Sequence, residues 1–464
     1  MKKIILVFFF CTANLVAFSQ NKTLSLNEYL SIVQQYHPIA KQAFLLNDRA
    51  RLTRRMALGG FDPKLSAEKE RKIYDGVSYY NYFTPEVKLP LWYGIDLKGS
   101  YTEYEGAFVN PENKLPNDGL SYVGLSLPVG RGLFIDERRA DLKLARIYQS
   151  VARNQQQMIL NDLYLEATQS YTDWLNSYQN VKVYTDAVDL AKIRLEGTKQ
   201  LFINGDKPAI DTLEALILLQ TRQFKLNEYQ QQLINFKNQL SAFLWLENNV
   251  AVDPEKIQII PDSLALSVST PTNLLTISPN TVAQQNPEIQ AYVFKLQELD
   301  IERRLKLEEI KPTLNFNLGV LNAGRNAFQN FNAPWLNNNQ KFGFSFFMPL
   351  TFTKQRAAYG LSKIKILETQ YELNDKQNVT ANKWRNYLND YYTYTAQIEL
   401  FEQTQANNRA LLKGEETKFR FGDSSLFLIN SREQKVLETQ EKINELLAKR
   451  LKTIQALRYL SNTF

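Results

Sequence analysis

The sequence has almost none of the side chains on which enzymes and metal sites depend. Its 464 residues include one cysteine, Cys11, and one histidine, His37. Cys11 lies in an N-terminal segment that we predict to be removed, so the mature chain has no thiol for a disulfide, a thiolate metal site or catalysis. A lone histidine cannot build a histidine metal cluster, and His37 reads as a polar residue of the first helix, before Pro38. Because no paired-carboxylate, metal-ligand or phosphate-loop spacing is present either, we expect no enzyme activity and no cofactor.

Long apolar runs and blocks of one charge are also scarce. Residues 1–19 carry Lys2 and Lys3, an apolar core and a cleavage site at Ala17-Phe18-Ser19, which predicts the signal peptide of an exported protein. No later run is long enough for a transmembrane helix. The net charge of +7 is mild and contains no basic block, so we expect no nucleic-acid partner. Such an exported chain is periplasmic, secreted or an outer-membrane β-barrel.

What is present is strand-like alternation, centred on Lys311–Leu350. Apolar residues take every second position in two runs, as in half-buried strands. Asn315, Asn317 and Ser345 fall on the other face, which we expect to line a lumen. Two strands cannot form a stable sheet alone, so this hairpin needs partners. The residues that we expect to face lipid are Leu314, Phe316, Leu318, Phe342, Phe344 and Phe346.

A second β region precedes this hairpin, at residues 62–128. Alternation predicts strands at Tyr79–Leu89, Tyr93–Tyr101 and Val123–Leu127. The region has room for four strands, so its extra segments are either further barrel strands or an extracellular hairpin. Its many tyrosines suit the interfacial girdles of a membrane barrel, although the ordinary β-propensity of aromatic residues explains part of this signal.

The remaining segments predict long helices because they contain little or no glycine or proline. Residues 140–196 predict a helix of about 85 Å, with apolar residues three or four apart as in a coiled coil. Residues 209–253 predict its antiparallel return after a turn at Gly205. Further helices are expected at 25–58, kinked by Pro38, and at 281–309, 361–413 and 426–460.

Five landmarks recur in the same order in the two halves of the chain. They are His37-Pro38 and Asn286-Pro287, Asp62-Pro63 and Lys311-Pro312, Leu127-Pro128 and Met348-Pro349, Arg139-Ala140 and Arg356-Ala357, and Gly205-Asp206 and Gly422-Asp423. We therefore predict two repeats, 20–253 and 280–464, joined by a connector at 254–279. Each has a helix, a β region (62–128 or 312–350) and a long helical hairpin with its tip at 202–211 or 419–428.

These landmarks together resemble the TolC family of outer-membrane efflux ducts. The first tip, from Phe202 through Gly205 to Asp211-Thr212-Leu213-Glu214-Ala215, is similar to the family's tip pattern, and the second is similar more loosely. The resemblance implies a mostly α fold with β, in which long antiparallel coiled-coil helices accompany strands of a transmembrane β-barrel shared by a homotrimer. It also implies a passive exit duct in the outer membrane that reaches into the periplasm. Its partners would be outer-membrane lipid, a periplasmic membrane-fusion adaptor and an inner-membrane pump.

The resemblance further implies that the adaptor docks at the tips and that a gate lies just beyond them. The docking residues would be Phe202, Asn204, Gly205, Asp206, Phe419, Gly422 and Asp423. The gate candidates are Asp211, Glu214, Phe427 and Asn430. Two plainer interpretations stay open: the tips are only structural turns, and the two carboxylates only begin a solvated helix. For the whole chain, the alternative function is a periplasmic coiled-coil scaffold or adhesin without a pore.

Overall fold

The computed structural model describes residues 22–106, 115–256, 259–262, 272–325 and 338–464. The predicted signal peptide at 1–19 and Cys11 lie outside the described residues. The chain divides into two compact units. The sheet unit comprises Phe44–Met158 and Gln284–Val379, and the helical unit comprises Met1–Ala43, Ile159–Ala283 and Thr380–Phe464. Each unit therefore contains segments of both predicted repeats, whose boundaries stay a prediction.

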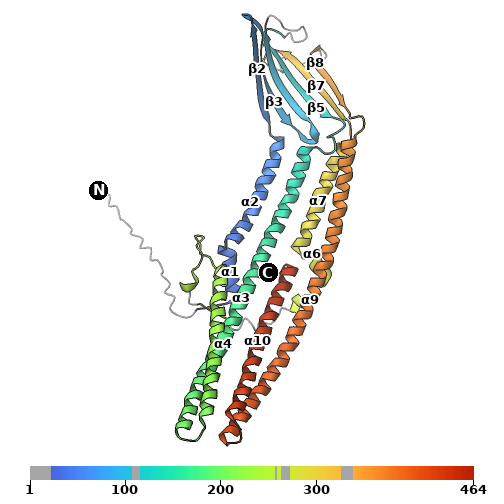
Figure 1. Ribbon diagram of the computed structural model, residues 1–464. Helices are drawn as coiled ribbons and strands as arrows, with labels where there is room; N and C mark the ends of the chain where they lie inside the picture. The colour runs from blue at the N-terminus through green and yellow to red at the C-terminus, as the bar shows by residue number, and fades with distance from the viewer. Residues whose placement is uncertain (1–21, 107–114, 257–258, 263–271, 326–337) are drawn as a thin grey trace, which may run out of the picture. The chain divides into compact units, whose positions relative to one another are not determined.

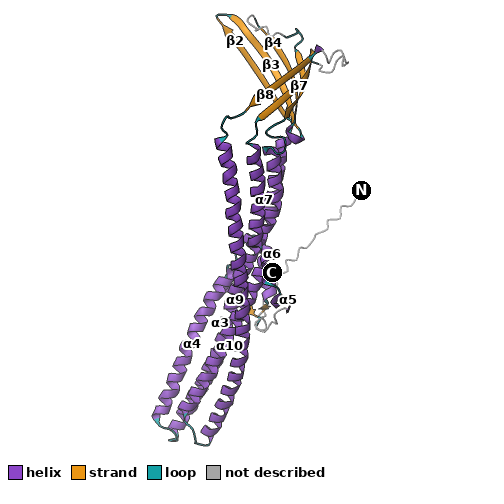
Figure 2. Ribbon diagram, turned by 90° about the vertical axis from the view of Figure 1, so that its right-hand side faces the viewer, coloured by secondary structure: helices purple, strands orange, loops and turns teal. Residues whose placement is uncertain are grey.

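The sheet unit holds one six-stranded antiparallel sheet (Figure 2). Its strands, in spatial order, are β2 (Lys64–Tyr74), β3 (Val77–Pro90), β4 (Asp96–Glu105), β5 (Leu120–Pro128), β7 (Thr313–Ala323) and β8 (Gln340–Phe347). The first half of the chain supplies four of these strands and the second half supplies two. Pairing of β5 with β7 joins the two halves, as the need of the second hairpin for partners predicted.

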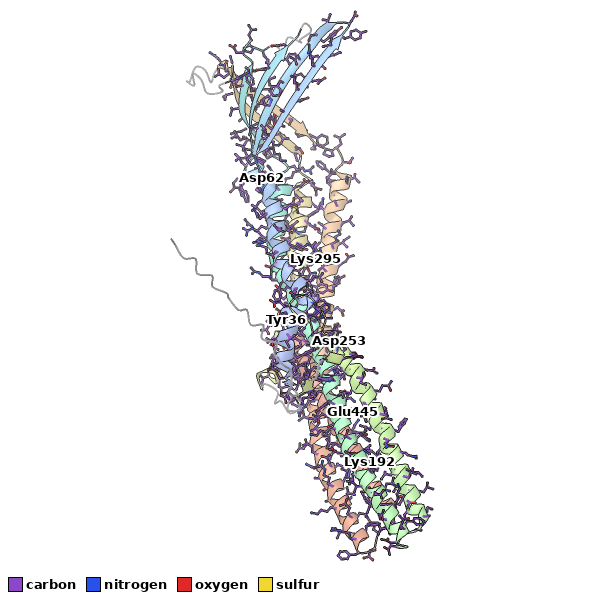
Figure 3. All side chains as sticks on the ribbon, turned by 90° about the vertical axis from the view of Figure 1, so that its left-hand side faces the viewer. Tyr36, Asp62, Lys192, Asp253, Lys295 and Glu445 are labelled. Carbon is purple, nitrogen blue, oxygen red and sulfur yellow. The ribbon has the colours of Figure 1, made fainter. Side chains whose placement is uncertain are left out.

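Four helical segments belong to the sheet unit. They are most of α2 (Pro38–Leu58), α7 (Pro287–Glu308), and the first parts of α3 (Glu137–Ile203) and α9 (Thr353–Arg420). Asp62 marks the point where the chain passes from the end of α2 towards β2 (Figure 3).

Ion pairs connect the β3–β4 turn with the start of α3. Asp96 pairs with Lys88 at 2.8 Å and with Arg138 at 3.0 Å. Asp136 pairs with Arg138 at 3.2 Å and with Arg139 at 2.9 Å. The recurring strand-to-helix landmark at Arg139 thus has a structural role, because this buried arginine also donates to the carbonyl of Leu133 at 3.1 Å.

The helical unit is built from two long helical hairpins and the elements around them (Figure 1). The rest of α3 returns through α4 (Ala209–Ser241), and the rest of α9 returns through α10 (Leu426–Ser461). Shorter elements complete the unit: β1 (Lys22–Leu24), α1 (Leu26–Tyr36), β6 (Ile259–Pro261), α5 (Thr272–Leu275) and most of α6 (Pro279–Gln285). One buried cluster of this unit packs Tyr29 and Val33 of α1 against Tyr171 and Leu175 of α3.

The predicted lengths of three helices were wrong. α3 and α9 run to 67 and 68 residues, longer than predicted. α4 ends at Ser241 and not at residue 253, and the chain beyond it forms a turn in which Asn249 takes a positive φ of 58° and Leu246 N–H donates to the carbonyl of Val250 at 2.9 Å. The absence of glycine and proline therefore did not ensure a helix. The parallel pairing of β1 with β6 was not predicted.

The two proline landmarks break their helices in the same way. α1 ends before His37 and α2 begins at Pro38; α6 ends before Asn286 and α7 begins at Pro287. His37 Nδ1 accepts the N–H of Ile39 at 3.2 Å, and Asn286 Oδ1 accepts the N–H of Glu288 at 3.0 Å. Each side chain before the proline thus caps the helix that follows it. The predicted kink at Pro38 is confirmed as a full break.

The histidine cap predicts that the free energy of unfolding depends on pH. One substitution should remove this dependence. Burial lowers the pKa of His37 below its ordinary value of 6.5, so the folded state binds this proton less tightly than the unfolded state. The free energy of unfolding should therefore fall as the pH drops below about 6.5. His37→Asn keeps the acceptor, as in Asn286, and should flatten the slope below about pH 6.5. Urea denaturation followed by circular dichroism checks this, and an equal slope in the variant would show that His37 does not cause it.

Candidate functional site

The sheet carries two chemically different faces. The register pairs Leu314 with Phe346, Phe316 with Phe344 and Leu318 with Phe342, so all six predicted lipid-facing residues share one face. Three of these phenylalanines are more than half exposed: Phe342 at 64%, Phe344 at 54% and Phe346 at 56%. The rings of Phe316 and Phe344 lie 5.2 Å apart between centroids. A water-soluble protein rarely leaves such an apolar surface uncovered.

The opposite face of the sheet is mostly polar. Asn315 pairs with Ser345 and Asn317 with Gly343, so the predicted lumen residues lie together on this face. Ser126 of β5 continues the row beside Asn317, and Ser100 of β4 lies on the same face. An exposed apolar face backed by a polar one is the pattern of a transmembrane barrel wall.

Both edges of this sheet are open. β2 and β8 each pair with one neighbour in the described part of the chain. The unpaired backbone N–H and C=O groups at such edges can form hydrogen bonds with another strand. Lipid cannot supply those hydrogen bonds. The sheet is therefore an incomplete wall.

The two hairpin tips share one backbone arrangement. Gly205 N–H donates to Phe202 O at 3.0 Å and Asp206 N–H to Leu201 O at 2.9 Å. At the second tip the same two bonds join Gly422 to Phe419 at 3.1 Å and Asp423 to Lys418 at 3.0 Å. This pair of bonds is a Schellman motif. It requires a left-handed residue, which glycine supplies with φ of 83° and 86°.

The tips lie side by side at one end of the helical unit (Figure 1). Lys207 of the first tip places its Nζ 4.9 Å from the ring centroid of Phe419 in the second. Phe419 is partly buried, whereas the predicted docking residues Phe202, Asn204 and Asp423 are exposed, as are Gly205, Asp206 and Gly422. Most of the predicted docking residues therefore form one accessible rim.

The predicted gate residues divide into two sets. Glu214 and Asn430 are bonded to each other, with Asn430 Nδ2 donating to Glu214 Oε1 at 3.2 Å. Asn430 is buried and also accepts from Arg194 at 3.1 Å, so it is engaged within one protomer. Asp211 is half-buried, and Phe427 is 65% exposed on the first turn of α10.

Three solved structures have this arrangement of elements. The CmeC outer membrane channel of Campylobacter jejuni has 14% identity over 95% of this chain and 86% of its own, with a TM-score of 0.65. The outer membrane protein VceC of Vibrio cholerae has 15% identity over 94% and 96%, with a TM-score of 0.63. The open state of the Neisseria gonorrhoeae MtrE outer membrane channel has 11% identity over 94% and 88%, with a TM-score of 0.66.

The chain has the fold of the outer-membrane channels. The predicted TolC-like fold is thus confirmed. No protein-family model matches the sequence, and no curated protein matches it. Within the described ranges, no helix is both long and apolar enough to span a membrane. The described residues also include no group of three or more histidine, cysteine or acidic side chains that fits a metal ion.

Sequence reasoning missed a buried charge cluster between the first hairpin of this channel fold and α10. Glu433 is 8% exposed as a side chain and lies 2.5 Å from Arg194 and 3.8 Å from Arg222. Arg222 is 1% exposed, and burial lowers its pKa against the attraction of Glu433. Nearby, Tyr229 stacks on Tyr184 at 5.3 Å. Each of these charged residues stands alone within a long polar helix, so no sequence pattern indicated the cluster. Only the packing of three helices brings the charged side chains together.

Proposed function

We propose that this chain is the outer-membrane exit duct of an export system, through which substrates pass passively. The observation that carries the proposal is the sheet with one exposed apolar face, one polar face and two open edges. The fold of the outer-membrane channels supports it. A periplasmic scaffold or adhesin has no use for a bare apolar sheet face, so that alternative explains less.

Strand number supports an oligomer. Closed membrane barrels need at least about eight strands, and the described residues of one chain supply six to this sheet. Several copies must therefore share a barrel, and the TolC resemblance favours three. Separation of inner and outer membranes tests the location: the protein should sediment with the outer membrane as a homotrimer. Recovery as a soluble periplasmic protein would overturn the proposal.

The exposed tip rim is our proposed docking surface for a periplasmic adaptor that connects the duct to an inner-membrane pump. Asn204→Trp or Asp206→Trp should abolish crosslinking to the adaptor in intact cells, because a bulky side chain on the rim blocks close approach. The trimer should remain in the membrane, since both side chains are exposed. Asn235→Trp, exposed on α4 but 26 residues beyond its start, is the matched control. Unchanged crosslinking and efflux in the rim variants would leave the tips as plain turns.

Asp211 and Glu214 are our proposed cation-attracting ring at the narrow end of the duct. Three copies of each carboxylate around one axis would repel anions, most strongly at low salt. Asp211→Asn combined with Glu214→Gln should lower the cation selectivity of the purified duct in a planar bilayer. Glutamine keeps an acceptor for Asn430, so the local packing should survive. Unchanged selectivity would place both carboxylates on the outer wall and leave Phe427 as the gate candidate.

A further inference from the structure

The size of the barrel depends on where the β2–β3 hairpin lies, an inference that rests on the proposed function. The β2–β3 hairpin is either part of the barrel wall or a projection outside it. Three copies of a six-stranded sheet would give 18 strands. If β2 and β3 stood outside the wall, β4 would be the edge and three copies would give 12.

Side chains near the base of β3 continue the apolar face in two rows of paired residues. One row of paired residues runs across five strands: Leu89, Leu97, Leu125, Leu318 and Phe342. The next row reaches all six strands: Leu65, Val87, Gly99, Val123, Val320 and Gln340. A hairpin outside the wall would have no reason to match these rows. The base of β2–β3 therefore carries the same face that we assign to lipid.

The far end of the same hairpin is charged on both faces. On the apolar side, Lys69 and Arg71 follow Leu65 and Ala67 along β2. On the polar side, Tyr82 Oη donates to Glu68 at 2.7 Å and to Glu70 at 2.9 Å. Charges on a lipid-facing side are costly near the midplane but tolerated at the interface and beyond it. The hairpin thus has an apolar base and a polar end that projects past the bilayer.

Strand direction allows the open edges to meet. Each strand of the sheet is antiparallel to its neighbour, so with six strands β2 and β8 run in opposite directions. β8 of one copy can then pair with β2 of the next in the antiparallel manner of all other pairs. The exposed Phe342 and Phe344 of β8 would continue the face of Leu65 and Ala67.

We propose that three copies close an 18-stranded barrel in which β8 of each copy pairs with β2 of the next. A strand spacing of about 4.8 Å and a tilt of about 40° give a backbone diameter of about 36 Å, against about 24 Å for 12 strands. Barrels of 16–18 strands hold an open aqueous channel. The outer-membrane segment would then pass bulky cargo, and the tips would set the narrowest point.

Cysteine pairs test the edge contact directly. Because Cys11 lies in the predicted leader, introduced thiols would be the only ones in the mature chain. Cysteine at Leu65 or Ala67, combined with cysteine at Phe342 or Phe344, should give covalent dimers and trimers on oxidation of the assembled protein. Ser66→Cys with Phe344→Cys places the thiols on opposite faces and should give none. Crosslinks from Leu97→Cys or Gly99→Cys of β4 to Phe342→Cys, or none from β2, would overturn the proposal.

Excision of the hairpin gives a second test. Lys64 pairs with Lys88, so deleting residues 64–88 joins Pro63 to Leu89 across a short gap. Polymers of graded size, added from the extracellular side of a bilayer, report the lumen width. The largest polymer that enters should shrink in radius by about a third to a half in the excised protein. An unchanged limit would mean that the hairpin is not in the wall, while conduction itself would leave the proposed duct intact.

Discussion

Replacing Phe344 by arginine should prevent the protein from accumulating as a trimer in the outer membrane. Phe344 lies on the apolar sheet face, pairs with Phe316 and is 54% exposed in one chain. An arginine on the lipid face of a barrel near the midplane costs about 2–4 kcal/mol. A trimer carries three copies, so the total cost approaches the whole stability of an ordinary domain. The amount of trimer on an unheated gel of outer membranes measures this effect.

Ser345→Arg is the matched control for this substitution. Ser345 is the next residue of β8 and shares the polar face with Asn315. Its arginine would extend into water, so trimer levels should stay near those of the unmodified protein. If Ser345→Arg blocked assembly while Phe344→Arg were tolerated, the two faces would be assigned the wrong way round.

Replacing Glu433 by alanine should strongly destabilise the helical unit. The change leaves Arg194 and Arg222 without their shared carboxylate, and Arg222 is almost fully buried. Removing one partner from a buried ion pair typically costs about 3–5 kcal/mol, because the remaining charge is uncompensated. Urea denaturation of the purified protein, followed by its helical circular dichroism, gives the change in the free energy of unfolding.

Two further variants separate charge from packing at this site. Arg222→Met in the Glu433→Ala background removes the buried positive charge that has lost its partner. It should therefore recover part of the lost free energy of unfolding, and a double-mutant cycle measures this recovery. Glu438→Gln, which breaks an exposed pair with Lys435 on the same helix, should cost less than about 1 kcal/mol. If Glu433→Ala cost no more than Glu438→Gln, water would compensate the two arginines and the cluster would not stabilise the fold.

The sequence predicted most of the helices and strands in which apolar residues recur at a regular spacing. Alternation found β7 and β8 and the face of each residue in them, and long stretches without glycine or proline found α3 and α9. It did not find β2, because Lys64–Tyr74 carries charges at both odd and even positions and all eleven residues are exposed. That strand is held by backbone pairing with β3, which a side-chain pattern cannot show.

The candidate sites were predictable to different degrees. Recurrence alone identified the tips, because a Schellman turn needs glycine at a fixed place and the chain contains it twice. The contact of Glu214 with Asn430 and the buried Arg222 depend on three helices that are distant in sequence. Their partners follow from packing geometry, which no spacing along one helix reveals.

Single-channel recording shows whether the protein forms a pore. The purified protein, reconstituted from outer membranes into a planar lipid bilayer, should produce discrete current steps of uniform size in potassium chloride, because a closed barrel with a polar interior conducts ions. Incorporation of the protein is confirmed by recovering it from lipid vesicles prepared in parallel. Protein that inserts but gives no current above that of bare lipid would contradict the account and favour a scaffold without a pore.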